Sequence, residues 1–199
     1  MFFIGGIYMA KSFGEQEKEL IKEKLRESCE ECWGRYGYAK TSVAQLCKMS
    51  GISTGAFYMF YASKEMLFID TIDGVGERYN NLIVQMMPEN PTKYDLGNVV
   101  KSLFHELIKT PWILKIQEDY KIFTKKLPPE FLENHYKNDI TDYSLMVEKY
   151  HLKPKVSVEV FTSITYILAF SIPSKALVED YYTEALDLII DSTIENYFY

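Results

Sequence analysis

Prolines divide the C-terminal two-thirds of the sequence into segments of helical length, and this spacing constrains the fold more than any other feature. The dividing residues are Pro88, Pro91, Pro111, Pro128, Pro129, Pro154 and Pro173. Between them, apolar residues recur with the 3.6-residue period of a helix, over roughly 95–108, 111–126, 129–150, 155–171 and 177–197. No run of useful length alternates apolar and polar residues as a half-buried strand does. The sequence therefore predicts an all-α fold.

The first third of the chain predicts shorter helices that begin at serine or threonine. A helix over 14–36 should end at Gly37, because glycine readily adopts the conformation that terminates helices. Hydroxyl side chains are good N-caps, so we expect Thr41 or Ser42 to start a helix through Met49. In the same way, a helix from Ser53 should extend to about residue 61, and a long one from Ser63 to about residue 87. The glycines at 74 and 76 predict a weak point in that last helix.

The stretch from Cys32 to Lys64 contains no Asp or Glu, although 28 of the 199 residues are acidic. Residues 10–65 carry nine Lys or Arg against eight Asp or Glu, whereas residues 66–199 carry 13 against 20. A surface that approaches the phosphate backbone gains from each cation and is repelled through each carboxylate. The acid-free stretch thus predicts a confined contact with nucleic acid, and the acidic remainder argues against wrapping.

Two short helical patterns meet at Ser50-Gly51-Ile52-Ser53, which predicts a helix-turn-helix. In that motif the first helix crosses the DNA backbone and the second enters the major groove by its N-terminal residues. Thr54, Gly55 and Ala56 would then face the base edges, and their small side chains permit close approach. Tyr58 and Lys64 are long enough to reach phosphate oxygens. We expect Phe57 to be a core residue.

The same region resembles the tetracycline-repressor (TetR) family of transcriptional regulators over about residues 14–70. The resemblance rests on Gly37-Tyr38, Thr41-Ser42-Val43, Leu46-Cys47, Ser50-Gly51-Ile52-Ser53, Gly55-Ala56-Phe57-Tyr58 and Ser63-Lys64-Glu65 with Leu67. It implies three N-terminal helices that bind DNA and C-terminal helices that form a ligand pocket. The last two helices would form a four-helix dimer interface.

Carried over by position, the resemblance implies phosphate contacts from Thr41, Tyr58 and Lys64, and base-edge positions for Thr54 and Ala56. The full predicted DNA-contact set is Lys40, Thr41, Ser42, Ser53, Thr54, Gly55, Ala56, Tyr58 and Lys64. The sequence departs from the family at Phe60 and Tyr61, where Tyr or His followed by Phe is common. Cys47 stands where a small alanine is usual.

We expect a DNA-binding domain over 10–62 and an effector-binding and dimerisation domain over 63–199. Residues 1–9 are expected to be a flexible extension, with either Met1 or Met9 as the native start. The apolar run at this end is too short to span a bilayer, so we expect a cytoplasmic protein without a membrane partner. Three cysteines without the dense spacing of a secreted scaffold also fit a reducing cytoplasm.

Large apolar side chains in the middle helices predict both a core and, from a subset, an effector pocket. The predicted pocket residues are Phe104, His105, Trp112, Tyr120, Phe123, Tyr143 and Tyr166. Segment 177–197 is apolar on two faces, one of which needs a partner. With segment 155–171 it predicts a homodimer interface lined by Phe161, Ile164, Leu168, Tyr182, Ala185 and Ile189. Two-fold pairing would match a palindromic operator.

Two alternatives accompany the prediction of a ligand-responsive repressor without catalytic residues, cofactor or metal. Cys29 and Cys32 could form a thiol switch or half of a metal site, although their place on the apolar face of a helix favours burial. The chain could also be a helical small-molecule-binding protein or an enzyme with a vestigial DNA-binding motif. The three histidines are far apart and no catalytic sequence motif is present, which speaks against an enzyme.

Overall fold

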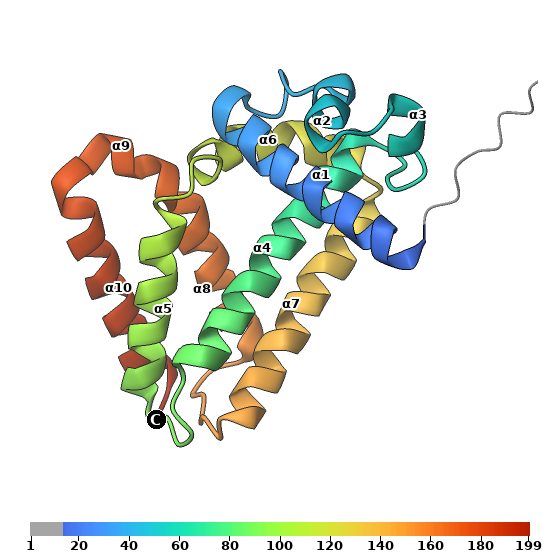
Figure 1. The fold of residues 1–199 in the computed structure, drawn as a ribbon. Coiled ribbons are helices and arrows are strands. Elements are labelled where there is room, and N and C mark those ends of the chain that lie inside the picture. The colour runs from blue at the N-terminus through green and yellow to red at the C-terminus, as the bar shows by residue number, and fades with distance from the viewer. Residues whose placement is uncertain (1–13) are drawn as a thin grey trace, which may run out of the picture.

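The computed structural model describes residues 14–199, apart from the side chains of residues 116–118, and this range is helical almost throughout (Figure 1). Its only extended pairing in the described range is an isolated bridge between Pro154 and Phe198. The all-α prediction is confirmed. The expectation for residues 1–9 lies outside the described residues.

Four helices make up the N-terminal part: α1 (Glu15–Tyr36), α2 (Val43–Ser50), α3 (Thr54–Phe57) and α4 (Lys64–Met86). Helix α1 packs against α2 and α4. It presents buried residues every three or four positions, namely Ile21, Leu25, Cys29, Cys32 and Trp33, which is the spacing of one helix face. Helix α4 is continuous through residues 73–76, so the predicted weak point does not break it. This long helix connects the end formed by α1, α2 and α3 to the rest of the molecule (Figure 1).

The remaining chain forms α5 (Lys93–Leu107), α6 (Ile113–Phe123), α7 (Pro129–Lys149), α8 (Val158–Ser171), α9 (Lys175–Val178) and α10 (Tyr182–Tyr197). Short 3-10 turns follow α6 (η1, Thr124–Lys126), α8 (η2, Ile172–Ser174) and α9 (η3, Glu179–Tyr181). Helix α10 packs along α5, α7 packs along α8, and α6 contacts both α1 and η2 (Figure 1). Helix α6 therefore lies between the two parts of the molecule.

Two predicted helices differ from the observed ones. The helix expected from Ser53 to residue 61 ends at Phe57, because the next amides, Met59 and Phe60, bond to carbonyls three residues back. The helix expected over 177–197 begins only at Tyr182, since Glu179 adopts φ 37° and interrupts it. Left-handed φ is unfavourable for a non-glycine residue and does not continue an α-helix.

Helices α5 and α10 are joined by both apolar packing and ion pairs. A Cβ added at Gly97 would lie 3.4 Å from Ile194 Cγ1, so the two helices approach closely there. Along the edge of the pair, two lysines and a histidine of α5 meet carboxylates of α10: Lys93–Glu195 at 3.0 Å, Lys101–Asp191 at 2.7 Å and His105–Asp187 at 2.8 Å. The antiparallel pair is thus fixed in register.

One apolar run in the described chain, Val158–Tyr197, passes a length and composition test for a membrane span. It comprises α8, α9 and α10 with the turns between them. The chain reverses direction within this run (Figure 1). It therefore forms two long helices, α8 and α10, that run in opposite directions with the short α9 between them.

Candidate DNA-binding interface and effector site

The turn between α2 and α3 has the backbone geometry that the sequence predicts. Ser42 caps α2 by accepting a hydrogen bond from Gln45 N at 3.2 Å, and Ser53 caps α3 by accepting one from Ala56 N at 3.1 Å. Gly51 lies in the left-handed region, with φ 72° and ψ 27°, where a side chain would be strained. The predicted caps Ser42 and Ser53 are confirmed.

Most side chains predicted to contact DNA are open to solvent. Lys40, Ser42, Ser53, Thr54 and Gly55 are exposed, and Ala56 is half-buried. Tyr58 is 57% exposed, and its ring meets the fully buried Phe57 edge-on. Phe57 is a core residue, as predicted. These positions belong to the acid-free stretch, so no carboxylate of that stretch competes with a phosphate.

Thr41 and Lys64 are held inside the domain instead. Thr41 is 1% exposed and its hydroxyl donates to Gly37 O at 2.8 Å, which leaves no free hydroxyl proton for a phosphate. Lys64 Nζ donates to Tyr38 O and Thr41 O, each at 2.8 Å, and lies 3.9 Å from the centre of the Tyr38 ring. Burial lowers the pKa of Lys64. Its predicted phosphate contact has one N–H left to make it.

Residues of α6 and η1 hydrogen-bond both the backbone and the side chain of Tyr38. Asp119 Oδ2 accepts hydrogen bonds from Tyr38 N at 2.9 Å and from Trp33 Nε1 at 2.7 Å. At the other end, Lys126 Nζ donates to Tyr38 Oη at 2.9 Å, and the Tyr38 hydroxyl donates to Glu65. A residue of the turn before α2 is thereby tied to α6 and η1.

The carboxylate of Glu65 shows how tightly this cluster is bonded. Burial works against its ionisation, but hydrogen bonds from Tyr38, its own backbone, Ser63 and Lys126 outweigh burial and lower the pKa of Glu65 to about 2. Burial and the hydrogen bond to Glu65 raise the pKa of Tyr38. At neutral pH the cluster therefore holds an ionised carboxylate and a neutral phenol.

Tyr38 and four other aromatic rings form a joint between the two parts of the chain: Trp33, Tyr38, Phe68, Trp112 and Phe123. Trp33 stacks on Trp112 with centroids 4.7 Å apart, and it lies 4.6 Å from Phe68 and 5.7 Å from Phe123. None of the five is more than 2% exposed. Trp112 and Phe123, predicted for the effector pocket, belong to this joint. Trp112 Nε1 is buried without a hydrogen-bond partner among the described residues.

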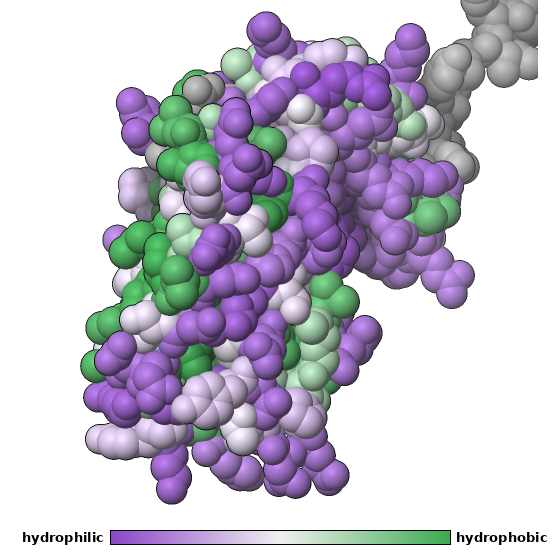
Figure 2. Space-filling model, turned by 90° about the vertical axis from the view of Figure 1, so that its left-hand side faces the viewer, coloured by the Kyte–Doolittle hydropathy of each residue, from purple (hydrophilic) through white to green (hydrophobic). Residues whose placement is uncertain are grey.

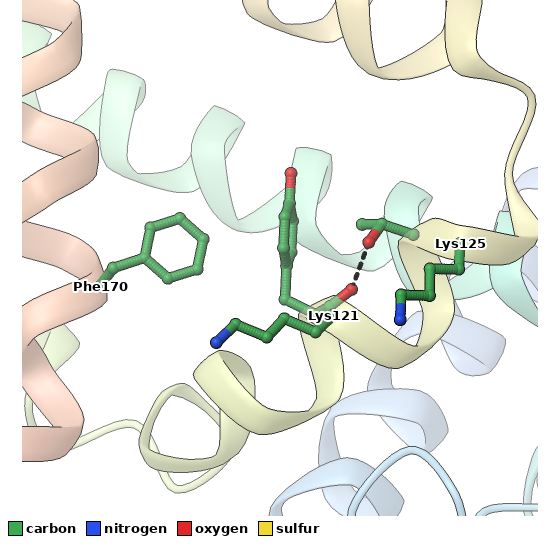
Figure 3. Close-up of a pocket in the computed structure, with 5 residues that line it drawn as sticks. Lys121, Lys125 and Phe170 are labelled. Carbon is green, nitrogen blue, oxygen red and sulfur yellow. Dashed lines mark hydrogen bonds between the residues drawn. The ribbon is translucent and has the colours of Figure 1, made fainter.

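The seven residues predicted for a pocket lie in different surroundings. Phe104 is buried, and His105 pairs with Asp187 on the α5–α10 edge. The Tyr143 hydroxyl donates to Thr165 at 3.4 Å, and the Tyr166 hydroxyl donates to Asp139. Of the seven, only Tyr120 lines the hollow of about 560 Å³ between α6, η1 and α8. The other residues of that hollow are Lys121, Thr124, Lys125 and Phe170 (Figure 3).

The residues predicted for a dimer interface divide into two groups. Phe161, Leu168 and Tyr182 are buried within the chain and pack its own core, and Ile164 is half-buried. Ala185 and Ile189 are exposed. They belong to a face that also exposes Ile167, Leu177, Val178, Tyr181 and Leu188. Seen from the side of α9 and α10, hydrophobic residues form a broken strip (Figure 2).

The cysteines have the character of core residues. Cys29, Cys32 and Cys47 are at most 2% exposed, all are free thiols, and burial raises the pKa of each. A buried thiol with a raised pKa is a poor nucleophile and a poor metal ligand. The structure thus gives the thiol switch no support.

No group of three or more His, Cys, Asp or Glu side chains in the described range could hold a metal ion. The three histidines lie in separate surroundings: His105 meets Asp187, His135 meets Asp73 at 3.1 Å, and His151 is exposed. The hydrogen bond to Asp73 raises the pKa of His135. The described residues offer a DNA-facing surface and a hollow as candidate sites.

Residues 26–71 match the family described as "Bacterial regulatory proteins, tetR family". This range runs from the middle of α1 through the helix-turn-helix into α4. The N-terminal domain belongs to the TetR family. The TetR-family resemblance seen in the sequence is confirmed, and with it the assignment of α2 and α3 to a DNA-binding helix-turn-helix. No protein of curated function matches the sequence.

Solved TetR-family structures share the fold of almost the whole chain. A TetR-family transcription regulator from Marinobacter aquaeolei superposes with a TM-score of 0.61 at 14% identity, covering 93% of this chain and 99% of the other. One from Haemophilus influenzae gives 0.60 at 17% identity, covering 93% and 100%. The transcriptional regulator FadR from Bacillus subtilis, in complex with stearoyl-CoA, gives 0.58 at 15% identity, covering 87% and 95%. The helical C-terminal domain thus has the TetR-family architecture.

Sequence reasoning did not identify the residues that join the two parts. Asp119 and Lys126 lie in a segment whose only visible pattern is helical periodicity, and neither is marked by a motif. Gly37 and Tyr38 were part of the family signature. The signature indicated that these two positions matter, but it did not show which residues contact them. Lys121, Lys125 and Phe170 of the hollow were also missed, since exposed lysines are common on helices.

Proposed function

We propose that this protein is a homodimeric transcriptional repressor that leaves a palindromic operator when a small apolar or aromatic effector binds. The observation that carries the proposal is the exposed, acid-free surface of α2 and α3 in a chain of net charge −6. Phosphate contacts provide the sequence-independent part of DNA affinity, and side chains at the tip of the second helix read the bases. Lys40, Thr54 and Tyr58 are exposed, as these roles require.

Dimerisation is supported by the exposed apolar face of α8 to α10. An exposed apolar face is costly in water unless a partner covers it, and Ile167, Tyr181 and Leu188 are 68%, 75% and 65% exposed. A second copy would bring two recognition helices about one DNA turn, ~34 Å, apart. One short helix contacts too few bases for useful specificity, so joint reading of two half-sites is expected.

The effector response would be a shift between two conformers. A ligand that binds better to the conformer unable to fit DNA lowers operator affinity by the ratio of its two affinities. FadR from Bacillus subtilis, which shares this fold, was solved with stearoyl-CoA, and this supports a small-molecule effector here. Helix α6 borders both the hollow and Tyr38, so it offers a physical route. We assign no enzymatic activity, and we place the protein in the cytoplasm.

DNA binding is tested with the DNA upstream of the protein's own gene and with sequence variants of that DNA. Lys40→Ala should weaken binding to all DNA sequences alike and lower the slope of log affinity against log salt by about one, as expected for one lost phosphate contact. Thr54→Ala should instead change operator preference. Lys137→Ala, which removes an exposed charge from α7, serves as the control. Unchanged salt dependence in Lys40→Ala would remove the phosphate assignment.

Dimerisation is tested by sedimentation. Wild-type protein should be dimeric at micromolar concentration, and Ile189→Asp should shift it toward monomer by placing a carboxylate in an apolar interface. Specific operator binding should fall with it. Because Ile189 is 51% exposed in the chain, the variant should keep its helical circular dichroism. Ligand binding without any operator binding would instead favour a binding protein with a vestigial DNA motif.

A further inference from the structure

The hollow between α6, η1 and α8 has an aromatic wall. Phe170 of α8 faces Tyr120 of α6, with ring centres 5.2 Å apart and planes at 74° (Figure 3). Tyr166 lies one turn earlier on α8 and stacks on Phe170 at 6.5 Å. The volume of about 560 Å³ falls within the roughly 300–1,000 Å³ of small-molecule sites. The hollow can therefore accept the apolar body of a small ligand.

Two lysines border the same hollow. Lys121 and Lys125 are four residues apart, which places them on one side of α6 and η1, and both are exposed. Neither has a hydrogen bond or ion pair among the described residues, whereas neighbouring Lys126 is bonded to Tyr38 and Glu65. Like charges at this spacing repel. An anion bound between them would relieve that repulsion.

A carboxylate that influences this wall is engaged in a hydrogen bond of its own. Asp139 of α7 accepts the hydrogen bond of the Tyr166 hydroxyl, which is one helical turn from Phe170. Burial first, and then the charge of Asp139, raises the pKa of Tyr120. The hollow is thus bordered by two cations, Lys121 and Lys125, and by the neutral phenol of Tyr120.

We propose that this hollow binds an amphipathic anion. Its apolar or aromatic body packs against the rings of Tyr120 and Phe170, and its acidic head group, a carboxylate or phosphate, pairs with Lys121 and Lys125. The proposal rests on the proposed function, because it names the chemical class of the effector. It differs from the pocket predicted from the sequence, which shares only Tyr120 with it and had His105 or a Tyr hydroxyl as polar group.

The position of the hollow links the ligand to the DNA-binding domain. Tyr120 and Lys121 follow Asp119 directly, and Lys125 precedes Lys126. Asp119 and Lys126 are the two residues of this segment that hydrogen-bond Tyr38. A ligand in the hollow contacts one side of α6 and η1. The other side of the same segment holds Tyr38, which lies in the turn before α2, so a displacement caused by the ligand can reach that turn.

The test compares three ligands of equal chain length by calorimetry on the full chain: decanoate, decyl phosphate and decanol. Wild-type protein should bind both anions more tightly than decanol. Lys121→Gln with Lys125→Gln should lower the affinity for both anions by about five- to tenfold, as expected for the loss of two partly exposed ion pairs. The affinity for decanol should change by no more than about twofold. The ranking of decanoate and decyl phosphate identifies the head group. Phe170→Ala should weaken all three.

The matched control is Lys137→Gln with Lys149→Gln on α7, which removes the same charge from exposed positions outside the hollow. Equal weakening in both double variants would reduce the effect to net charge and overturn the proposal. So would a Lys121/Lys125 variant that keeps its anion affinity but loses DNA affinity and salt dependence, since these lysines would then contact DNA.

Failure of this inference and failure of the proposed function give different results. Wild-type protein that binds its operator but none of the three ligands would overturn the site and leave the repressor assignment standing. Tight, lysine-dependent binding of the anions without any operator binding would keep the site and overturn the repressor assignment. Release of operator DNA by decanoate, absent in the Lys121/Lys125 double variant, is the result expected when both hold.

Discussion

The two sides of helix α6 differ in how they are packed. On one side, Trp33, Tyr38 and Phe123 belong to a joint of rings that are at most 2% exposed, and Asp119 ties the backbone of Tyr38 to it. On the other side lie an open hollow and α7, none of whose residues is buried. Dense packing transmits displacement, whereas sparse packing permits local opening at low free-energy cost. One helix therefore combines a rigid attachment with a face that can yield.

This contrast in packing predicts that a small displacement of α6 at the hollow can have a large effect at the joint. A shift of α6 at its sparsely packed face costs few contacts, but at the joint the same shift displaces a whole cluster of rings and Tyr38 with them. Packed cores have discrete arrangements rather than a continuous range of them. The expected behaviour is a switch between two positions of the DNA-binding domain.

The largest expected effect comes from truncating one ring in each region. Phe123→Ala should destabilise the protein by about 3–5 kcal/mol, because it leaves a cavity in the joint. Phe131→Ala on α7, where the ring is only partly buried, should cost about 1 kcal/mol. Urea unfolding followed by circular dichroism measures both. Equal losses would mean that the two sides of α6 are packed alike.

The next effect concerns the buried carboxylate. Asp119→Ala removes the acceptor of Trp33 Nε1 and Tyr38 N and leaves two buried donors unpaired, which should cost about 2–4 kcal/mol. Asp191→Ala on α10 breaks an exposed ion pair with Lys101 and should cost under about 1 kcal/mol. Asp119→Asn should recover part of the loss, since a neutral oxygen still accepts. If the Asp119→Ala variant unfolds no more readily than the Asp191→Ala variant, the hydrogen bonds that Asp119 accepts from Trp33 and Tyr38 contribute nothing to stability.

The smallest effect is a pH dependence from Glu65. Its pKa is lowered to about 2 from an ordinary value of 4.5, so its contribution is complete above about pH 4.5 and is lost as the pH falls toward 2. The loss in this window should reach roughly 2–3 kcal/mol. Glu65→Gln should flatten the stability profile there, as measured by urea unfolding at pH 6, 4.5 and 3. Glu133→Gln, exposed on α7, should leave the profile unchanged. A wild-type profile already flat below pH 4.5 would contradict the assigned pKa.

The sequence predicted what depends on local signals. Helix periodicity, the prolines, and the caps at Ser42 and Ser53 located the helices and the turn because each signal acts within a few residues. The length of α3 was wrong, since the hydrogen bonding after Phe57 changes without a marker in the sequence. The break before Tyr182 was missed because the turn at Glu179 contains neither glycine nor proline.

Side-chain roles were harder to predict than helices. Trp112 and Phe123 were assigned to a pocket, yet a large aromatic residue gives the same sequence pattern whether it lines a cavity or fills a core. Likewise, Tyr182 and Ile189 lie on one helix, but the first packs inward and the second faces solvent. Which face of a helix meets which neighbour is a tertiary property. The proximity of Asp119 to Tyr38 is visible only in the folded structure.

The anchoring of Lys64 has a consequence for the kinetics and thermodynamics of any contact with DNA. A free lysine loses about 1.5–2 kcal/mol of rotamer entropy when it is immobilised, and a binding partner normally bears that cost. Here two carbonyl oxygens and the Tyr38 ring already immobilise the ammonium group. A phosphate that accepts its third N–H would meet a donor ordered during folding. Such a contact would form without a further conformational search, and it would be lost together with the turn whenever Tyr38 moves.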